Sequence, residues 1–331
     1  MHPSTPMTTD FIAPLTDIGF ILVSGTDAAQ FLHNQLTNDV LHLSQSDVRL
    51  AGYCSPKGRL LATLMIWKHH DIYVIQLPRA IQATIQKRLN TFVLRSKVTL
   101  SDGSDQFSAL GLSGNPLTTP LIDTLTRWFS DLPSIPYQKI DTEAGSLIRL
   151  SDADHMPRYQ WITTTDQALI LWPTLIQTDP TAALNRWRLS EIHAGIPTLT
   201  AETQDQFIPQ TLNFELIGGV NFKKGCYPGQ EIVARTQYLG KLKRRMTLAS
   251  INTTQLDQVL PGTELFSGHD ASQPCGQIIQ AALNLQGGID CLITLQLTAF
   301  PHNTIHLSSS QGDTMTLKTL PYALPELSNN P

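Results

Sequence analysis

Residues 207–235 read FIPQTLNFELIGGVNFKKGCYPGQEIVAR, and the interpretation of the whole chain starts from this stretch. Gly225 and Gly229 allow backbone conformations that are costly for other residues. Pro228 suits a turn or the first turn of a helix. The pattern predicts a turn that leads into a helix, with Cys226 just before the helix N-terminus.

Cys226 is the best candidate for a reactive group. Backbone amides at a helix N-terminus favour a thiolate, and Lys223 and Lys224 act in the same direction. An isolated cysteine is otherwise a small packing residue, and we expect this of the other three, Cys54, Cys275 and Cys291. The alternative that Cys226 only packs a turn stays open, and it predicts that Cys226→Ser leaves cellular function intact.

The cysteines and histidines show no metal-binding or disulfide pattern. The four cysteines are widely separated without a CxxC pair, so neither a disulfide framework nor a zinc site is indicated. His69 and His70 are adjacent in the sequence and cannot chelate one ion from the same helix face. We therefore assign no metal ligand.

Charge is distributed unevenly along the chain. The formal net charge is −4, but residues 223–245 carry seven Lys and Arg side chains against one Glu, which makes that segment +6 and the remainder −10. A basic segment is a landing place for an anionic partner if its side chains share a face. The alternative is an ordinary solvated face with salt bridges.

Local patterns predict an α+β region followed by a β domain. A helix is expected from Asp27, with Gln30 completing a capping box, to about Asn38. Strands are expected at Leu60 to Trp67 and Ile72 to Leu77, and a helix at Asp179 to Ala194. A second α+β unit is expected at roughly 107–177. Alternation and turn residues after Gly240 predict an antiparallel barrel or sandwich from about residue 241.

The composition is that of a globular protein. With 331 residues, 41% of them hydrophobic and 15% charged, the chain has the material for two or three domains and a substantial core. Its longest apolar run is far too short to span a bilayer, so we expect no membrane segment. The N-terminus lacks a signal or transit pattern, and we expect a cytoplasmic protein.

The motif KKGCYPGQE resembles that of the YgfZ-type folate-binding proteins of the glycine cleavage T-protein (aminomethyltransferase) superfamily. The upstream FIPQ agrees with this, and so does an N-terminal pattern made of Gly25, Asp27, Phe31, Leu32, Gln35, Thr37 and Asp39. The resemblance extends from about Ile18 to Pro321, and the cysteine-containing motif is highly specific.

The resemblance implies an α+β, three-lobed cloverleaf fold. Residues 1–240 would form two ferredoxin-like lobes, the second at roughly 107–177, and residues 241–331 a C-terminal antiparallel β-barrel. It also implies a central channel for tetrahydrofolate or a one-carbon derivative. The implied role is iron-sulfur cluster assembly or repair in client enzymes, with an effect on tRNA modification.

The same resemblance assigns individual residues. Trp187 falls where family members place a folate-contacting tryptophan, and an indole can stack on a flat pterin ring. Its alternative is a helix residue buried between lobes. Cys226 is the functional cysteine of the motif, and folate binding is assigned to neighbouring residues of the motif and helix: Lys223, Lys224, Tyr227, Gln230, Glu231 and Arg235.

One departure from the superfamily excludes an activity. T-protein enzymes carry paired acidic residues after a Gly-rich turn, and this chain has Ala62 and Thr63 there. Without that carboxylate the proton handling of aminomethyl transfer is missing, so we expect no glycine-cleavage aminomethyltransferase activity.

Three functions stay open. The first is a folate-dependent accessory factor in iron-sulfur protein maturation, which need not be catalytic. The second is a folate-dependent enzyme that acts directly on tRNA by one-carbon transfer, with the 223–245 segment on the phosphates. The third is a folate-binding regulator.

Overall fold

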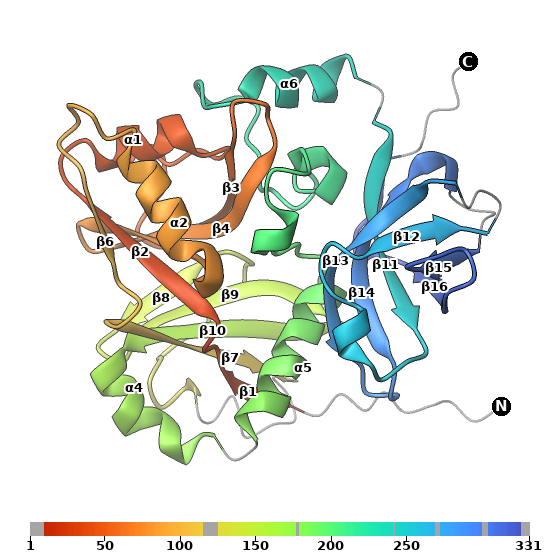
Figure 1. Cartoon of the computed structure of the whole chain (residues 1–331). Helices are drawn as coiled ribbons and strands as arrows, with labels where there is room; N and C mark the ends of the chain where they lie inside the picture. Colours follow the sequence, from red (N-terminus) through yellow and green to blue (C-terminus); the bar gives the residue numbers. More distant parts are fainter. Residues whose placement is uncertain are drawn as a thin grey trace.

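The computed structural model describes residues 10–114, 125–176, 179–240, 242–268, 272–299 and 304–325. Within these ranges the strands form two five-stranded antiparallel sheets and one closed six-stranded antiparallel barrel. The sheets lie one above the other, and the barrel lies beside them (Figure 1). No helix in these ranges is long and apolar enough to cross a membrane.

The first lobe contains the upper sheet of Figure 1, with strand order β3-β4-β5-β2-β6. Its elements are β2 (Ile18–Ser24), α1 (Ala28–Gln35), β3 (Val48–Cys54), β4 (Leu60–His69), β5 (Ile72–Pro78), α2 (Arg79–Asn90) and β6 (Thr99–Asp102). The predicted pair of strands is confirmed, because β4 and β5 are antiparallel neighbours.

The second lobe repeats this order in its four consecutive strands, although no repeat is evident in the sequence. Its sheet is β1-β7-β10-β9-β8, so β8-β9-β10-β7 corresponds to β3-β4-β5-β2. The elements are β1 (Phe11–Pro14), β7 (Phe107–Ser113), β8 (Lys139–Thr142), β9 (Gly145–Ala153), β10 (Met156–Thr164) and α4 (Thr165–Leu171). The fifth strand, β1, comes from the N-terminal part of the chain and pairs with β7.

Four strands of the first sheet, β3, β4, β5 and β2, are buried on both faces, because each face packs against a different layer. On β4, Leu64 and Ile66 belong to the core under α1 and α2, while Met65 and Trp67 belong to the core shared with the second sheet. Alternate side chains of a strand point to opposite faces, so a nearly continuous apolar run supplies two cores at once.

The helix α5 (Pro180–His193) follows the second lobe and lies between it and the barrel (Figure 1). The predicted boundaries are confirmed: the Asp179 carboxylate caps the helix by accepting hydrogen bonds from the amides of Thr181 and Ala182, at 3.2 and 3.3 Å. The helix α6 (Gln230–Tyr238) begins directly after the glycine turn of the motif.

The barrel confirms the C-terminal antiparallel domain. Its strands are β11 (Arg244–Ile251), β12 (Glu264–Ser267), β13 (Pro274–Leu283), β14 (Ile289–Gln296), β15 (Ile305–Leu307) and β16 (Thr314–Lys318). Their apolar side chains fill its interior.

A charged cluster ties the barrel to the rest of the molecule. The His193 ring at the end of α5 bonds Asp154 of the second lobe through Nδ1, at 2.6 Å. Its Nε2 bonds the buried Asp290 of β14, at 2.7 Å. Asp290 is also paired with Lys318 of β16, at 2.9 Å. These partners raise the pKa of His193 to about 9 against the opposing effect of burial.

Candidate functional site

A cavity of about 120 Å³ lies between the two sheets and α5. Its apolar walls come from both lobes and from the segment that precedes the motif, and they include Leu50, Met65, Leu77, Leu150 and Phe214. Polar side chains from α5, β10 and the start of β2 also reach it. A largely apolar cavity with a few polar groups is the usual form of a small-molecule site.

Arg158 of β10 is the most unusual of these polar residues. Its side chain is 1% exposed, and its Nε and Nη2 atoms have no hydrogen-bond partner among the described residues. The guanidinium carbon lies 4.5 Å from the centre of the Trp187 ring, in a cation–π contact. Burial lowers the pKa of Arg158, although an arginine stays charged at ordinary pH. Unsatisfied buried donors that line a cavity are available to a ligand.

Glu191 supplies acceptors in the same cavity. It lies one helical turn after Trp187 on α5, so both side chains are on the same face of the helix. Burial raises the pKa of Glu191 to about 7, and the charge of Arg158 opposes that rise. The hydrogen bond between the Trp187 side chain and the Glu191 carboxyl group also opposes the rise in this pKa.

Trp187, which the family resemblance assigns to folate, lines the cavity and is 2% exposed. The benzene ring of the indole lies against Gly111 of β7, where an added Cβ would come within 2.3 Å of it. One tryptophan is thus in contact with both the sheet and the Arg158 guanidinium. The position also agrees with the alternative of a buried helix residue, so its contact with folate stays a prediction.

The position of the missing acidic pair also faces this cavity. Thr63 lines it, and the Thr63 hydroxyl accepts a hydrogen bond from the Leu199 amide at 3.3 Å. Ile18, at the start of β2, is a further lining residue. The carboxyl groups among the lining residues are instead those of Asp17 and Glu191, and Asp17 is paired with Arg188 at 2.6 Å.

The motif forms a second site, on top of the molecule in Figure 1 and outside the described lining of the cavity. Gly229 has a φ of 79° and lies directly against the turn after β3. A Cβ on Gly229 would come within 2.5 Å of the Gly58 backbone. Gly58 itself has a φ of 69°. The two glycines let two turns pack backbone to backbone, which fixes the start of α6.

Lys224 anchors the cysteine loop to the first lobe. Its ammonium group donates hydrogen bonds to the carbonyl oxygens of His33 and Leu36, which lie at the C-terminal end of α1. It also lies 4.7 Å from the centre of the Tyr227 ring. Burial lowers the pKa of Lys224 to about 8, while the charges of Asp39 and Cys226 oppose the shift. Tyr227 is buried, so this pair holds the loop from its inner side.

Cys226 is exposed, whereas Cys54, Cys275 and Cys291 are buried. Burial raises the pKa of the Cys54 thiol to about 12, and it also raises those of Cys275 and Cys291. A buried thiol with a raised pKa is a poor nucleophile and a poor metal ligand. Cys226 is accordingly the accessible thiol of the four.

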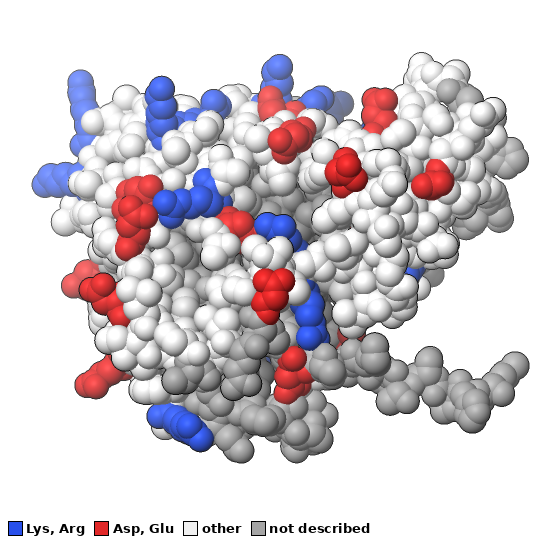
Figure 2. All heavy atoms as spheres, turned by 60° about the horizontal axis from the view of Figure 1, so that its bottom comes forward, with Lys and Arg blue, Asp and Glu red and all other residues white. Residues whose placement is uncertain are grey.

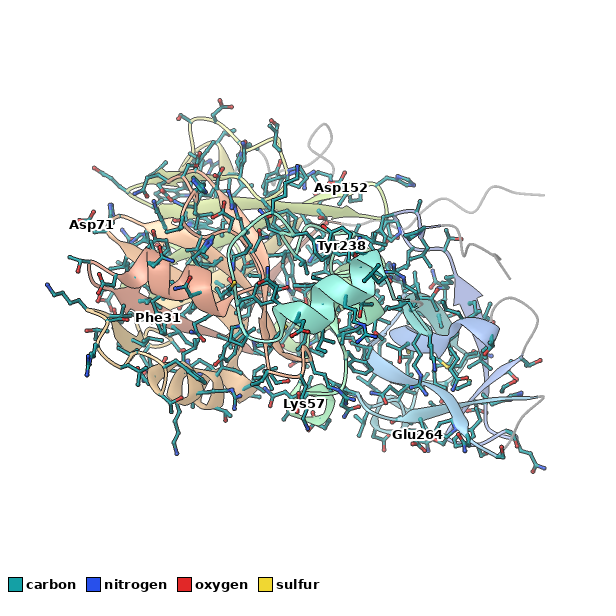
Figure 3. The ribbon with its side chains drawn as sticks, turned by 90° about the horizontal axis from the view of Figure 1, so that it is seen from above. Phe31, Lys57, Asp71, Asp152, Tyr238 and Glu264 are labelled. Atoms are coloured by element: carbon teal, nitrogen blue, oxygen red, sulfur yellow. The ribbon has the colours of Figure 1, made fainter. Side chains whose placement is uncertain are left out.

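The basic residues of segment 223–245 differ in their surroundings: Lys241 lies outside the described residues, and Arg244 is half-buried. Lys224 is bound to α1, and Arg245 is paired with Glu215 at 2.5 Å. Lys223, Arg235 and Lys243 are exposed, as is Lys57 on the neighbouring turn. Figure 3 shows Lys57 beside α6, whose end is marked by Tyr238. Figure 2, in which the bottom of Figure 1 comes forward, shows a face where acidic and basic side chains are interspersed.

The motif residues assigned to folate lie at different depths. Glu231 and Arg235 are exposed on α6, and Gln230 begins that helix with a half-buried side chain. The described structure does not bring these residues into the cavity that Trp187 lines.

Sequence reasoning missed Arg158 and Glu191. Glu191 had a local signal, since it follows Trp187 by four residues on the same helix. Arg158 had none, because a lone arginine in a strand is ordinarily solvent-exposed. Among the described residues no cluster of three or more His, Cys, Asp and Glu side chains could hold a metal ion.

Comparison with known proteins identifies the fold of the chain. No protein-family model matches it. A glycine cleavage system aminomethyltransferase T from Bartonella henselae has a similar structure, with a TM-score of 0.71 at 13% identity over 94% of this chain and 86% of that chain. This likeness confirms the expected T-protein-like fold.

Two curated relatives are similar over nearly their whole length. The tRNA-modifying protein YgfZ of Colwellia psychrerythraea is 31% identical over 317 residues, which cover 95% of this chain and 94% of the relative. That of Escherichia fergusonii is 29% identical over 327 residues, 98% of this chain and 95% of the relative. This chain therefore belongs to the family of the tRNA-modifying protein YgfZ.

Proposed function

We propose that the protein is a tetrahydrofolate-binding accessory factor that supports tRNA-modifying enzymes through the assembly or repair of their iron-sulfur clusters. The names of its relatives support the link to tRNA modification. The observation that carries folate binding is the cavity between the lobes, where the Arg158 Nε and Nη2 atoms beside Trp187 lack a hydrogen-bond partner among the described residues. Such work on bacterial tRNA-modifying enzymes would take place in the cytoplasm.

The residues present fit a folate. The cavity has apolar walls for a flat ring and a carboxyl group on α5. It also has the buried cation of Arg158, two of whose nitrogens lack a hydrogen-bond partner in the described part of the chain. When bound, tetrahydrofolate would supply one-carbon or reducing chemistry. Arg158, Trp187 and Glu191 would hold and orient its ring, and the apolar walls would exclude water.

In the same proposal Cys226 serves a partner outside the cavity. Its thiol is exposed on a loop that Lys224 fastens to α1, and this suits contact with a client protein. A single cysteine cannot fill the four cysteine positions of an iron-sulfur cluster. Any cluster at Cys226 would therefore be shared with a client or a second copy.

A complementation experiment tests this function. An Escherichia strain lacking its YgfZ relative would receive the wild-type chain, Cys226→Ser or Arg158→Met, and its tRNA modifications would be measured by mass spectrometry. We expect the wild type to restore iron-sulfur-dependent modifications and both variants to fail. Full restoration by Cys226→Ser would contradict the role of the thiol.

The alternative is an enzyme that acts directly on tRNA by one-carbon transfer. The exposed basic residues Lys57, Lys223, Arg235 and Lys243 around the motif favour it. Binding of tRNA to the purified protein should then weaken steeply with salt, by roughly one decade in affinity per decade of salt for each neutralised phosphate. Weak, salt-insensitive binding would count against this alternative.

A further inference from the structure

Exposed cations without an ion pair gather on the first lobe and the motif. In the second lobe, α5 and the barrel, Lys139, Arg149, Arg188 and Lys318 are each paired with an aspartate. On the first lobe and the motif, several exposed cations have no ion pair with a described carboxylate. They are Lys57, Arg59, Lys87, Arg95, Lys97, Lys223 and Arg235.

Segment 72–101 of the first lobe is basic throughout. It carries five Lys and Arg side chains and no Asp or Glu, in a chain with a formal net charge of −4. Between α2 and β6 it makes a loop, residues 91–98, in which Phe92 is 41% and Leu94 87% exposed. Leu94 also has a φ of 48°, which is uncommon for a bulky side chain. Large apolar side chains therefore project into solvent beside the cations Arg95 and Lys97.

The helix α1 joins this loop to the cysteine loop. Just before the helix, the Asp27 carboxylate accepts a hydrogen bond from the Lys97 amide at 2.7 Å. At its end, the Lys224 ammonium group donates to the carbonyl oxygens of His33 and Leu36. Eight residues of α-helix extend about 12 Å, so the two loops are held a short and fixed distance apart.

The surface of α1 between the two loops is uncharged. Its exposed side chains are those of Gln30 and Asn34, and the Gln30 amide donates to the Asn34 side-chain oxygen at 2.9 Å. The helix α1, marked by Phe31 in Figure 3, lies on the same upper side of the molecule as α6 (Figures 1 and 3). We call the following row of side chains the α1 strip: Phe92, Arg95, Lys97, Gln30, Asn34 and Lys223.

The α1 strip has the chemistry of a nucleic-acid surface. A phosphate backbone is charged at every nucleotide, so a row of separate unpaired cations fits it. Phe92 offers an exposed aromatic face on which an unpaired base can stack. Gln30 and Asn34 offer amide donors and acceptors to bases and ribose hydroxyls.

We propose that the α1 strip binds RNA, with Arg95, Lys97 and Lys223 on phosphates and Phe92 stacked on an unpaired base. This goes beyond the proposed function, because an accessory factor with such a surface contacts the RNA substrate of its clients as well as the clients. It is also independent of folate binding, since no residue of the strip lines the cavity between the lobes.

The experiment measures binding of a fluorescently labelled RNA stem–loop to the full chain by anisotropy, over a series of salt concentrations. The variants are Arg95→Gln/Lys97→Gln, Phe92→Ala and the control Arg127→Gln, which changes an exposed cation of the second lobe. The double variant should lower the slope of log affinity against log salt by about 1.4, at about 0.7 for each single-stranded phosphate. Phe92→Ala should weaken binding by roughly 5- to 150-fold without changing the slope, because it removes stacking. The control should change neither.

Several results would overturn the inference. One is an unchanged slope in the double variant, and another is an equal loss in Arg127→Gln. Binding of phosphatidylglycerol vesicles or of polyglutamate in place of RNA would mean a membrane surface or a site for an acidic protein instead. Photo-crosslinking of the RNA to the wild type needs no variant and should map to residues 91–98; crosslinks confined to the second lobe or the barrel would also contradict it. Tetrahydrofolate should bind the double variant and the wild type alike, so failure of the RNA site and failure of the folate function are distinguishable.

Discussion

Replacing Arg158 with methionine should make the empty protein more stable while it abolishes ring binding. The side chain is 1% exposed, and two of its nitrogens lack partners among the described residues. Each unsatisfied buried donor costs about 1–3 kcal/mol. The cation–π contact between Arg158 and Trp187 offsets about 0.5–2 kcal/mol of this cost. The two donors together cost about 2–6 kcal/mol. Methionine keeps an adaptable apolar stem, so the net gain in the free energy of unfolding should be about 3 kcal/mol, within a range of roughly 0–5.5 kcal/mol.

The assay is urea unfolding at about pH 5.5, where Glu191, with a pKa of about 7, is neutral and needs no counter-charge. At about pH 8 the gain in the free energy of unfolding should be smaller, because the ionised Glu191 of the variant no longer has the Arg158 cation beside it. The matched control is Arg149→Met on the neighbouring strand. Its guanidinium donates to the Leu150 carbonyl and to Asp152, so its loss should destabilise the protein. Equal destabilisation by both variants would refute the reasoning.

Three further predictions concern other parts of the chain. His193→Gln should lower the free energy of unfolding by about 3 kcal/mol below pH 6.5, because the pKa of His193 is raised to about 9. The difference between the two proteins should vanish as the pH rises through 9. A pH-independent difference in urea unfolding would contradict the stabilising role of the charged cluster around His193. Gly229→Ala should lower the free energy of unfolding by at least about 2 kcal/mol, since φ at this position is 79° and the new Cβ would clash with the Gly58 backbone. An unchanged melting temperature would argue against this packing of the two turns. Tetrahydrofolate binding should weaken as the pH falls below 7, because burial raises the pKa of Glu191 to about 7 and its protonation removes a charged hydrogen-bond acceptor from the cavity. The neighbouring charged and titratable groups are Asp17, Arg188, Tyr137 and Arg158, and a flat pH profile in calorimetry would exclude that role.

Local patterns predicted those features that neighbouring residues determine. The strands β4 and β5, the capped helix α5, the turn before α6 and the barrel all have their signals within a few residues. The capping box at Asp27 was wrong, because its carboxylate accepts from the Lys97 amide at 2.7 Å and Gln30 donates to Asn34. The Asp27 carboxylate therefore binds an amide far along the chain instead of capping the helix that follows it.

The features that sequence reasoning missed depend on segments that meet only in the folded chain. The pairing of β1 with β7 joins residues about a hundred positions apart. The assignment of Lys224 to folate stays a prediction. What the motif did not indicate is that its ammonium group is bonded to carbonyl oxygens almost two hundred residues earlier in the chain. The Arg158 Nε and Nη2 atoms lack a hydrogen-bond partner among the residues that the structure describes, and this depends on which side chains the fold brings together around the cavity.

The measurement that tests the central claim most directly is calorimetric titration of tetrahydrofolate into the wild type, Arg158→Met and Cys226→Ser under reducing conditions. The account predicts that the wild type and Cys226→Ser bind alike and that Arg158→Met loses binding, because the ring lies in the cavity between the lobes and the thiol acts elsewhere. Binding that survives in Arg158→Met but is lost in Cys226→Ser would contradict it and would move the folate site to the motif.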